Sequence, residues 1–557
     1  MRILPVAALL ASFSPASFAQ SPVLKILSEE LDRNFRILKE KADPPPYFIS
    51  YEITEEEAHT VGATLGAISL NNGVRNRHLD ISLRVGSPKL DNYRRMQGDR
   101  PQPPSGVRVS LDDNAVSIRQ SLWLETDRAY RRAAERLIKI RSNEQVKVAA
   151  EDRSSDFSAE APSVHGEAPA PLEFTAAAWS DRIRKLSLAF RSFPKILTSG
   201  VSLIAQREVK YLASTEGSRL EHGRNFVRIM ISAEGRAVDG MNLRTAAAFD
   251  AADVAGLPGD DALLSAINRV GKDLTDLLDA PVAEPFLGPA IFSGRAAAVF
   301  FHEIFGHRIE GHRQKDESEG QTFTKSLGAG VLPEFLSVVF DPTLPKWQDT
   351  DLNGWYAYDD EGVAGQRVTA VDHGILKAFL MSRSPIQGFE HSNGHGRRQP
   401  GYEVVSRQSN LVVESARTVS EPRLRDMLIA EVKRQSKPYG LRFEDVTGGY
   451  TTTGRRGMQA FKVLPVVVYR VYADGRPDQL IRGADIVGTP LASFAKILAT
   501  SDRPEVFNGY CGAESGMVPV SAIAPAILVS EIEIEKKEKS QDKPPLLPFG
   551  KDDEVGE

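Results

Sequence analysis

An apolar run that leads directly into a histidine–glutamate motif places the strongest limit on how this chain can fold. Residues 295–301, RAAAVFF, favour helix and are almost entirely apolar. The next residues are His302 and Glu303. The run therefore predicts a buried helix that presents His302 and Glu303 near its C-terminal end.

The motif itself reads H-E-x-x-x-H and consists of His302, Glu303 and His307. Two imidazoles can hold a divalent metal such as zinc, and a neighbouring carboxylate that does not bind the metal can take a proton from water. In a regular helix, positions i and i+5 lie about 140° apart around the axis, against about 40° for i and i+4. The helix must therefore distort, and Gly306 permits tightening, a π-bulge or an early end. The alternative is two unrelated histidines with ordinary hydrogen bonds.

A metal would need a third ligand, and the residues alone leave three candidates. Glu310 and His312 are near in sequence, and Cys511 is distant. Cys511 is the only cysteine of the chain, so it cannot form an internal disulfide. In an exported protein a free thiol would meet oxidants unless it were buried or bound to metal, which favours Cys511 as a ligand. Burial as an inert side chain is the alternative.

The N-terminal residues predict export. Residues 1–19, MRILPVAALLASFSPASFA, contain Arg2, a short apolar region and small residues at Ser17 and Ala19. This pattern is typical of a signal peptide cleaved near Ala19, and the expected location is the bacterial periplasm. The alternative is a poorly ordered apolar N-terminus. The run is too short to span a bilayer, and no later stretch is long and apolar enough, so we expect no membrane span.

Length and patterning predict an α+β protein with an N-terminal mixed α/β domain followed by a β-rich C-terminal domain. The 557 residues suffice for two to four domains, and the net charge of −5 argues against nucleic-acid binding. Strands are expected at 60–70 and 78–85, joined by a turn at Asn71-Asn72-Gly73. The expected segments are a signal peptide at 1–19, an N-terminal α/β region at 20–149, a linker or surface loop at 150–172, a central α/β region at 173–312 that ends in the motif helix, a β-rich domain at 313–534 that contains Cys511, and a disordered tail at 535–557.

Other polar residues have both a functional and an ordinary interpretation. Glu310 could orient a metal-binding histidine or be a solvated carboxylate at a helix end. His312 is more typical of a surface or cavity-lining residue than of a ligand. The acidic cluster with Asp360 and Glu361 could hold a substrate amine, although such clusters usually face solvent. Arg397 and Arg398 lie in a glycine-rich stretch and could bind a substrate carboxylate or carbonyl.

Five segments of the second half of the chain are HEIFGHRIEG at 302–311, DDEGVAGQRV at 359–368, GILKAFLMSR at 374–383, SNGHGRR at 392–398 and NGYCGAESGMVPVS at 508–521. In this order they resemble the TldD/PmbA family of metallopeptidases. The resemblance covers the last half of the chain clearly and the middle more loosely, while residues 20–150 are less typical.

The resemblance implies a TldD/PmbA-like fold and a zinc-dependent peptidase. It assigns zinc binding to His302, His307 and Cys511, and activation of the attacking water to Glu303. It further implies an enclosed site for unfolded or extended peptides, and a homodimer or a heterodimer with a PmbA-like subunit. Because the metal motif is present, the chain resembles the catalytic branch. The alternative is a non-catalytic peptide-binding or scaffold subunit whose metal is structural and bound by four side chains.

Overall fold

The structure is a computed structural model that describes residues 21–96, 106–144, 152–455, 461–488, 493–540, 542–545 and 547. The predicted signal peptide and the last ten residues of the predicted tail lie outside this part of the chain. Among the described residues, no helix is both long enough and apolar enough to cross a bilayer. The overall class is α+β, as predicted.

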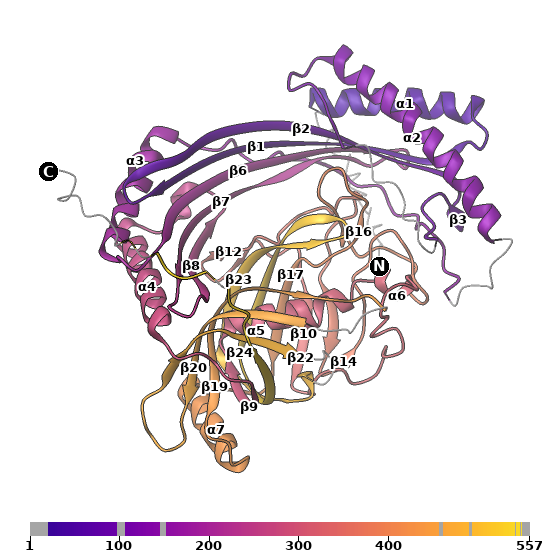
Figure 1. Ribbon diagram of the computed structural model, residues 1–557. Coiled ribbons are helices and arrows are strands. Elements are labelled where there is room, and N and C mark those ends of the chain that lie inside the picture. Colours follow the sequence, from indigo (N-terminus) through magenta and orange to yellow (C-terminus); the bar gives the residue numbers. More distant parts are fainter. Residues whose placement is uncertain are drawn as a thin grey trace, which may run out of the picture.

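The first half of the described chain builds an eight-stranded sheet in the order β3-β2-β1-β6-β7-β5, with β4 beside β2 and β8 beside β7. Its long strands arch over the rest of the molecule (Figure 1). Part of segment 150–172, the expected linker or surface loop, belongs to this sheet, because β5 lies there and pairs with β7. The predicted segment boundaries stay predictions. The strands are β1 (Pro46–Thr64), β2 (Ala67–Ser87), β3 (Leu90–Asp91), β4 (Val107–Arg108), β5 (Val164–Gly166), β6 (Thr198–Ser214), β7 (Arg219–Arg236) and β8 (Asn242–Ala251).

The β1–β2 hairpin turns at a different place from the predicted Asn71-Asn72-Gly73. Leu65 and Gly66 form the turn, and both have positive φ angles, 49° and 92°, as tight hairpin turns require. Residues 71–73 lie inside β2, where they pair with residues 59–61 of β1. The preference of residues 71–73 for a turn is overridden because β1 pairs along its length with both β2 and β6.

Helices cover this sheet at both ends (Figure 1). At one end, α1 and α2 bury apolar side chains against β1 and β2, and at the other, α3 and α4 do so against β6 to β8. Leu24, Leu27 and Leu31 of α1 recur at helical spacing and are fully buried. The helices are α1 (Pro22–Lys41), α2 (Ala115–Glu144), α3 (Ala176–Ser187) and α4 (Asp260–Asp279), with short 3-10 turns at Leu188–Ser192 and Val254–Gly256.

The second half is rich in strands, which confirms the prediction of a β-rich C-terminal domain. Its twelve-stranded sheet, counted over the described residues, follows β14-β13-β10-β17-β24-β22-β20-β19-β9. Because β9 also pairs with β24, the last part of this path closes on itself. The strands are β9 (Phe286–Phe292), β10 (Leu336–Phe340), β13 (Val368–Asp372), β14 (Ile375–Leu376), β17 (Asn410–Ser415), β18 (Thr418–Val419), β19 (Gly440–Thr451), β20 (Phe461–Val471), β21 (Gln479–Ile481), β22 (Ala484–Gly488), β23 (Ile497–Ala513) and β24 (Gly516–Lys536).

Smaller elements complete this half. Two short hairpin pairs lie outside the large sheet, and α7 packs against β9, β23 and β24. The elements are α6 (His312–Lys315), α7 (Glu421–Arg434), β11 (Lys346–Trp347), β12 (Thr350–Asp351), β15 (Gly396–Arg397) and β16 (Val405–Ser406).

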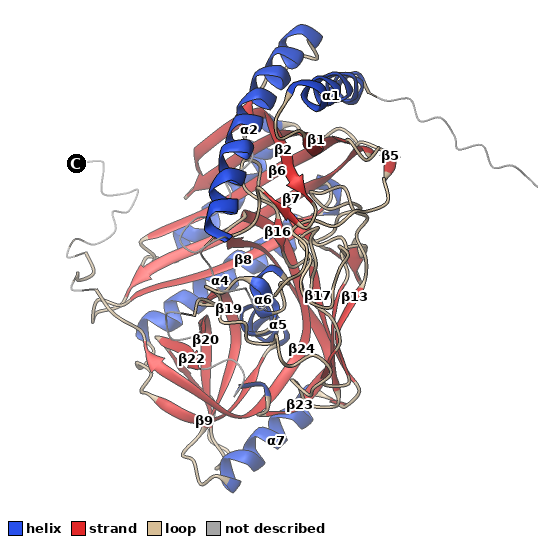
Figure 2. Cartoon of the chain, turned by 90° about the vertical axis from the view of Figure 1, so that its right-hand side faces the viewer, coloured by secondary structure: helices blue, strands red, loops and turns tan. Residues whose placement is uncertain are grey.

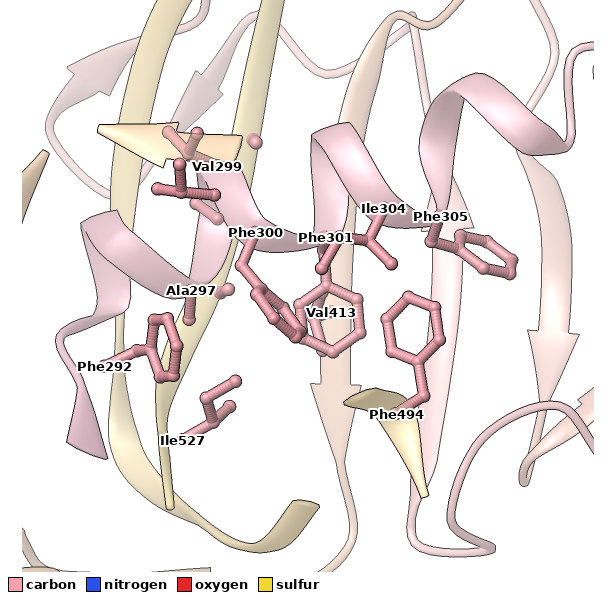
Figure 3. Close-up of a cluster of buried hydrophobic side chains, with 14 of the residues drawn as sticks. Phe292, Ala297, Val299, Phe300, Phe301, Ile304, Phe305, Val413, Phe494 and Ile527 are labelled. Atoms are coloured by element: carbon pink, nitrogen blue, oxygen red, sulfur yellow. The ribbon is translucent and has the colours of Figure 1, made fainter. Parts of the chain in front are cut away.

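The buried helix α5 (Gly294–Ile304) lies among these strands, as Figure 2 shows. It packs against β24, β19 and β23. Phe300 and Phe301 are fully buried and contact the ring of Phe494 (Figure 3). A helix that is apolar all round is stable only inside a core. Ser293 caps its start by accepting a hydrogen bond from the backbone N–H of Ala296.

Candidate metal centre

Helix α5 ends between the two histidines of the motif. Its last residue is Ile304, and His307 lies in a separate 3-10 turn, Gly306–Arg308. Of the distortions that the motif spacing allows, the structure therefore has the early helix end. A Cβ at Gly306 would lie only 1.9 Å from Oε1 of Gln408. A side chain larger than that of glycine would therefore displace the amide group of Gln408.

Two side chains fix the backbone at the end of α5. The guanidinium of Arg308 donates hydrogen bonds to the carbonyl oxygens of Glu303 and Ile304, each 3.0 Å long. Gln408 donates to the carbonyl oxygen of His302 at 3.3 Å. These carbonyls lack partners within the helix, and a positive charge suits the C-terminal end of a helix dipole. Sequence reasoning missed both residues, although Arg308 directly follows the motif.

The structure brings His302, His307 and Cys511 together. Each offers a ligand atom, and these three atoms lie within 4.8 Å of one another. The Sγ atom of Cys511 is 3.3 Å from Nε2 of His307. Cys511 lies on β23, opposite Val518 of β24. Two imidazole nitrogens and one thiolate sulfur form a set that suits zinc, and three protein ligands leave the fourth tetrahedral position open.

The charges around Cys511 favour the thiolate that binds metal. Burial by itself raises the pKa of the Cys511 thiol, but His307, His302 and Arg407 outweigh it and hold the pKa well below its usual value. The thiolate is the form of cysteine that coordinates metal. The donor chemistry of the cluster therefore fits zinc.

Glu310 orients His307 from the side opposite Cys511. Its Oε2 lies 3.4 Å from Nδ1 of His307, and Arg313 donates to the same oxygen at 2.8 Å. A proton held on Nδ1 leaves the Nε2 lone pair directed at the cluster. Burial alone would raise the pKa of Glu310, but His307, Arg313 and Arg407 lower it to about 2. Of its two interpretations from sequence, the solvated carboxylate does not hold, since Glu310 is fully buried.

Glu303 lies beside the donor atoms without being one of them. Its Oε2 is 4.0 Å from Nε2 of His307. Burial raises the pKa of the Glu303 carboxyl, against the lowering effect of the two histidines. A carboxylate with a raised pKa is the stronger base. Gly449 of β19 makes room for it, because a Cβ there would lie 2.7 Å from Cγ of Glu303. No sequence pattern indicates this contact between Gly449 and Glu303.

His312 is neither on the surface nor among the three donors. It is buried, and its Nε2 is hydrogen-bonded to Glu514, whose other oxygen accepts a hydrogen bond from Arg313 at 2.9 Å. Its place is thus an internal ionic cluster next to Glu310, so of the two expected positions, on the surface or lining a cavity, the surface one is wrong.

The acidic cluster at 359–361 is internal, which corrects its interpretation as a solvated face. Asp360 pairs with Lys210 of β6 and accepts from the backbone N–H of Arg398 at 2.7 Å. Glu361 accepts from the backbone N–H of Arg383 at 2.6 Å. Asp359 accepts from the backbone N–H of Gly396 at 2.9 Å. These contacts connect loops to one another, so the carboxylates are already used within the chain.

The two neighbouring arginines are also used internally, contrary to the expectation of substrate binding. Arg397 donates to the carbonyl oxygens of Gln408 and Pro519, at 2.9 and 2.6 Å. Arg398 donates to Oε1 of Glu52 on β1 at 3.0 Å. Both side chains are buried. Arg398 thereby joins the two halves of the molecule.

Residues 287–536 match the family model described as the PmbA/TldA metallopeptidase C-terminal domain. This C-terminal part of the chain belongs to the TldD/PmbA family. It is similar to a metalloprotease of Methanocaldococcus jannaschii, 28% identical over 41% of this chain and 47% of the relative. A zinc metalloprotease TldD homolog of Saccharolobus solfataricus is 25% identical over 44% of this chain and 51% of the relative. The chain thus spans about half the length of these curated relatives.

The fold of this TldD/PmbA member extends further than the sequence matches. The crystal structure of TldE from Thermococcus kodakarensis superposes with a TM-score of 0.62 and 15% identity, over 91% of this chain and 100% of that one. Identity this low supports similarity of fold alone. It covers the arched sheet as well as the C-terminal domain.

The predicted signal peptide and periplasmic location require correction. The matching relatives are named metalloprotease or TldD homolog, and no signal-peptide or periplasmic feature is evident among them. The apolar run at 1–19 is short and is interrupted by Pro5, Ser12, Ser14 and Pro15, so its pattern is also what an ordinary apolar N-terminus can show.

Proposed function

We propose that this chain is a zinc-dependent peptidase in which His302, His307 and Cys511 hold the metal and Glu303 is the general base. The observation that carries the proposal is the convergence of two imidazoles and one thiolate beside a buried carboxylate that is not itself a donor. Relatives named metalloprotease and zinc metalloprotease support it.

In this proposal Glu303 takes a proton from the water that attacks the peptide carbonyl and passes it to the leaving nitrogen. Bound zinc would polarise the carbonyl and lower the pKa of the attacking water. Glu310 keeps the proton on Nδ1 of His307, so that Nε2 stays available to the metal. The raised pKa of Glu303 suits both halves of the proton transfer.

A structural metal in a non-catalytic subunit is less well supported. Such a site fills all four positions with side chains. Glu310 already binds His307 and Arg313, and His312 binds Glu514. Neither residue belongs to the group of converging donors.

We further propose that the substrates are unfolded or extended peptides. Glu303, His307 and Cys511 are buried, whereas His302 is partly exposed, so substrate would enter from the side of His302. A compact folded domain is too large to enter such a buried site. Strands around the site can bind an extended peptide through its backbone, with little dependence on the identity of its side chains. The partner in this proposal is a PmbA-like subunit or a second copy of the chain, in keeping with the fold similarity to TldE.

The direct test is a metal analysis combined with a peptide-library digest, with and without chelator. We expect about one zinc per chain, as three converging ligands imply, and cleavage that stops with chelator and returns with zinc. Cleavage that chelator leaves unchanged would contradict the proposal. A stably folded protein and its unfolded variant then test the substrate class, since equal cleavage rates would argue against an enclosed site.

A further inference from the structure

A run of five polar residues, SRQSN at 406–410, is completely buried next to the metal centre. Buried polar side chains are costly unless they have partners. Gln408 of this run already holds the carbonyl oxygen of His302. Its neighbour Arg407 has no part in the proposed chemistry, yet it is among the largest fully buried side chains of the described chain.

Arg407 contacts both halves of the metal centre. On the Cys511 side it donates to the carbonyl oxygen of Cys511 at 2.6 Å. It also donates to Oγ of Ser515 at 2.7 Å, in the turn between β23 and β24. On the His307 side its Nε lies 3.5 Å from Oε1 of Glu310. Glu310 is the residue that orients His307.

The contact with Glu310 is an ion pair between two buried groups. Arg313 holds the other oxygen of Glu310 at 2.8 Å, so the carboxylate lies between two guanidinium groups. Within the described part of the chain, neither Nε of Arg407 nor Oε1 of Glu310 has a hydrogen-bond partner. Their separation exceeds an ordinary N–H···O hydrogen bond by about half an ångström. Each atom therefore depends on the other for compensation of its charge.

We propose that Arg407 is a positioning residue that sets the separation of His307 and Cys511 and thereby the affinity for the metal. This inference rests on the proposed zinc site. The planar guanidinium reaches the Cys511 carbonyl, the Ser515 hydroxyl and the Glu310 carboxylate at once, which a lysine ammonium cannot do. Through these contacts Arg407 connects ligands that lie 204 positions apart in the sequence.

The test is Arg407→Lys, which keeps the positive charge near Cys511 and removes the planar guanidinium with its several N–H donors. Mutation of groups that orient metal ligands typically weakens metal affinity 10- to 100-fold. We expect a rise of about 10- to 100-fold in the zinc dissociation constant, measured by competition with a chromogenic chelator. The cobalt-substituted variant should also show a weaker thiolate-to-cobalt charge-transfer band, because the thiolate is no longer held in place.

Arg482→Lys is the matched control. Arg482 is also buried and binds one carbonyl oxygen, that of Ala280 at 2.8 Å, and one carboxylate, that of Asp239 at 2.9 Å. None of these residues belongs to the metal centre. We expect this variant to lose thermal stability while its zinc affinity and cobalt spectrum stay like those of the unaltered protein.

Ser515→Ala tests the same connection without altering any charge, in case Arg407→Lys folds poorly. It removes one acceptor of the guanidinium, and we expect zinc affinity to fall by a smaller factor in the same direction. Unchanged affinity and an unchanged cobalt spectrum in folded Arg407→Lys, or in Ser515→Ala where Arg407→Lys does not fold, would overturn the inference. An equal loss of affinity in Arg482→Lys would overturn it too. Unaltered protein that binds no zinc would instead overturn the metal centre itself.

Discussion

The Sγ atom of Cys511 lies 3.3 Å from Nε2 of His307, on a strand far from the motif helix in sequence. If this contact marks a metal site, Cys511→Ser should lose most of its zinc, because a serine hydroxyl stays protonated and is a poor ligand. Zinc per chain by elemental analysis measures the effect. Tyr510→Phe is the control: its side chain is 40% exposed and should be dispensable for zinc. Full zinc occupancy in Cys511→Ser would remove the cysteine from the ligand set.

Glu303→Gln separates the base from the ligands. Glutamine keeps the shape of the side chain but accepts no proton, so the variant should retain zinc and lose kcat by several orders of magnitude. The exposed Glu334→Gln should behave like the unaltered enzyme in both assays. Activity in Glu303→Gln near that of the control would exclude it as the base, and loss of zinc would make it a ligand.

Gly449→Ala should impair catalysis without touching a ligand. The added Cβ would lie 2.7 Å from Cγ of Glu303 and 2.9 Å from the carbonyl oxygen of Lys462, so Glu303 must move. A misplacement of about 1 Å can cost about 100-fold in rate, and we expect a kcat loss of that order with zinc content unchanged. Gly454→Ala is the control, since its Cβ would meet only the carbonyl oxygen of Ser318 at 4.0 Å. Equal kcat values for the two variants would contradict the proposed contact.

His222→Gln should make the protein less sensitive to acid. Burial, aided by the charge of Lys210, lowers the pKa of His222 from its usual value of 6.5 to about 3. The unfolded chain therefore binds a proton between these pH values that the folded chain does not, so folding stability falls as pH drops below 6.5. The His222 contribution approaches about 1.4 kcal/mol per pH unit in this window.

Urea unfolding at pH 7.5 and pH 5 measures this effect. We expect the difference between the two pH values to be smaller in His222→Gln than in the unaltered protein. An equally large pH effect in His222→Gln would show that His222 is protonated in the folded state.

Local sequence patterns correctly predicted elements that are encoded by their own residues, such as a helix with a continuous apolar surface. The run at 295–301 correctly indicated a buried helix, because a helix apolar on every side has only one stable environment. The prediction of a turn at Asn71-Gly73 was wrong because these residues pair with β1 inside the long β1–β2 hairpin. The true turn, Leu65-Gly66, uses a leucine at positive φ, a conformation that no sequence rule assigns to leucine.

The site was predictable where its residues form a compact motif, and not where they act through distant partners. The five-residue spacing predicts a distortion of the helix, and of the three open forms the structure has the early end, at Ile304. The contact between Gly306 and Gln408 cannot be read from the sequence. From the sequence, Asp360 could be a substrate-binding residue or part of a solvated face, and Arg398 could bind substrate. Their partners, Lys210 and Glu52, come from strands more than a hundred residues earlier, and one sequence alone does not reveal such pairs.

The order in which the donors occur along the chain has a consequence for biosynthesis. His302 and His307 are synthesised before Cys511 and the β23–β24 hairpin, and 204 positions separate His307 from Cys511. A ribosome-bound chain that stops before this hairpin has only two of the three donors. Under the proposed function, such a chain cannot digest unfolded neighbours, including other nascent chains on the same messenger. The peptidase would become active only after the β23–β24 hairpin has been synthesised and has folded.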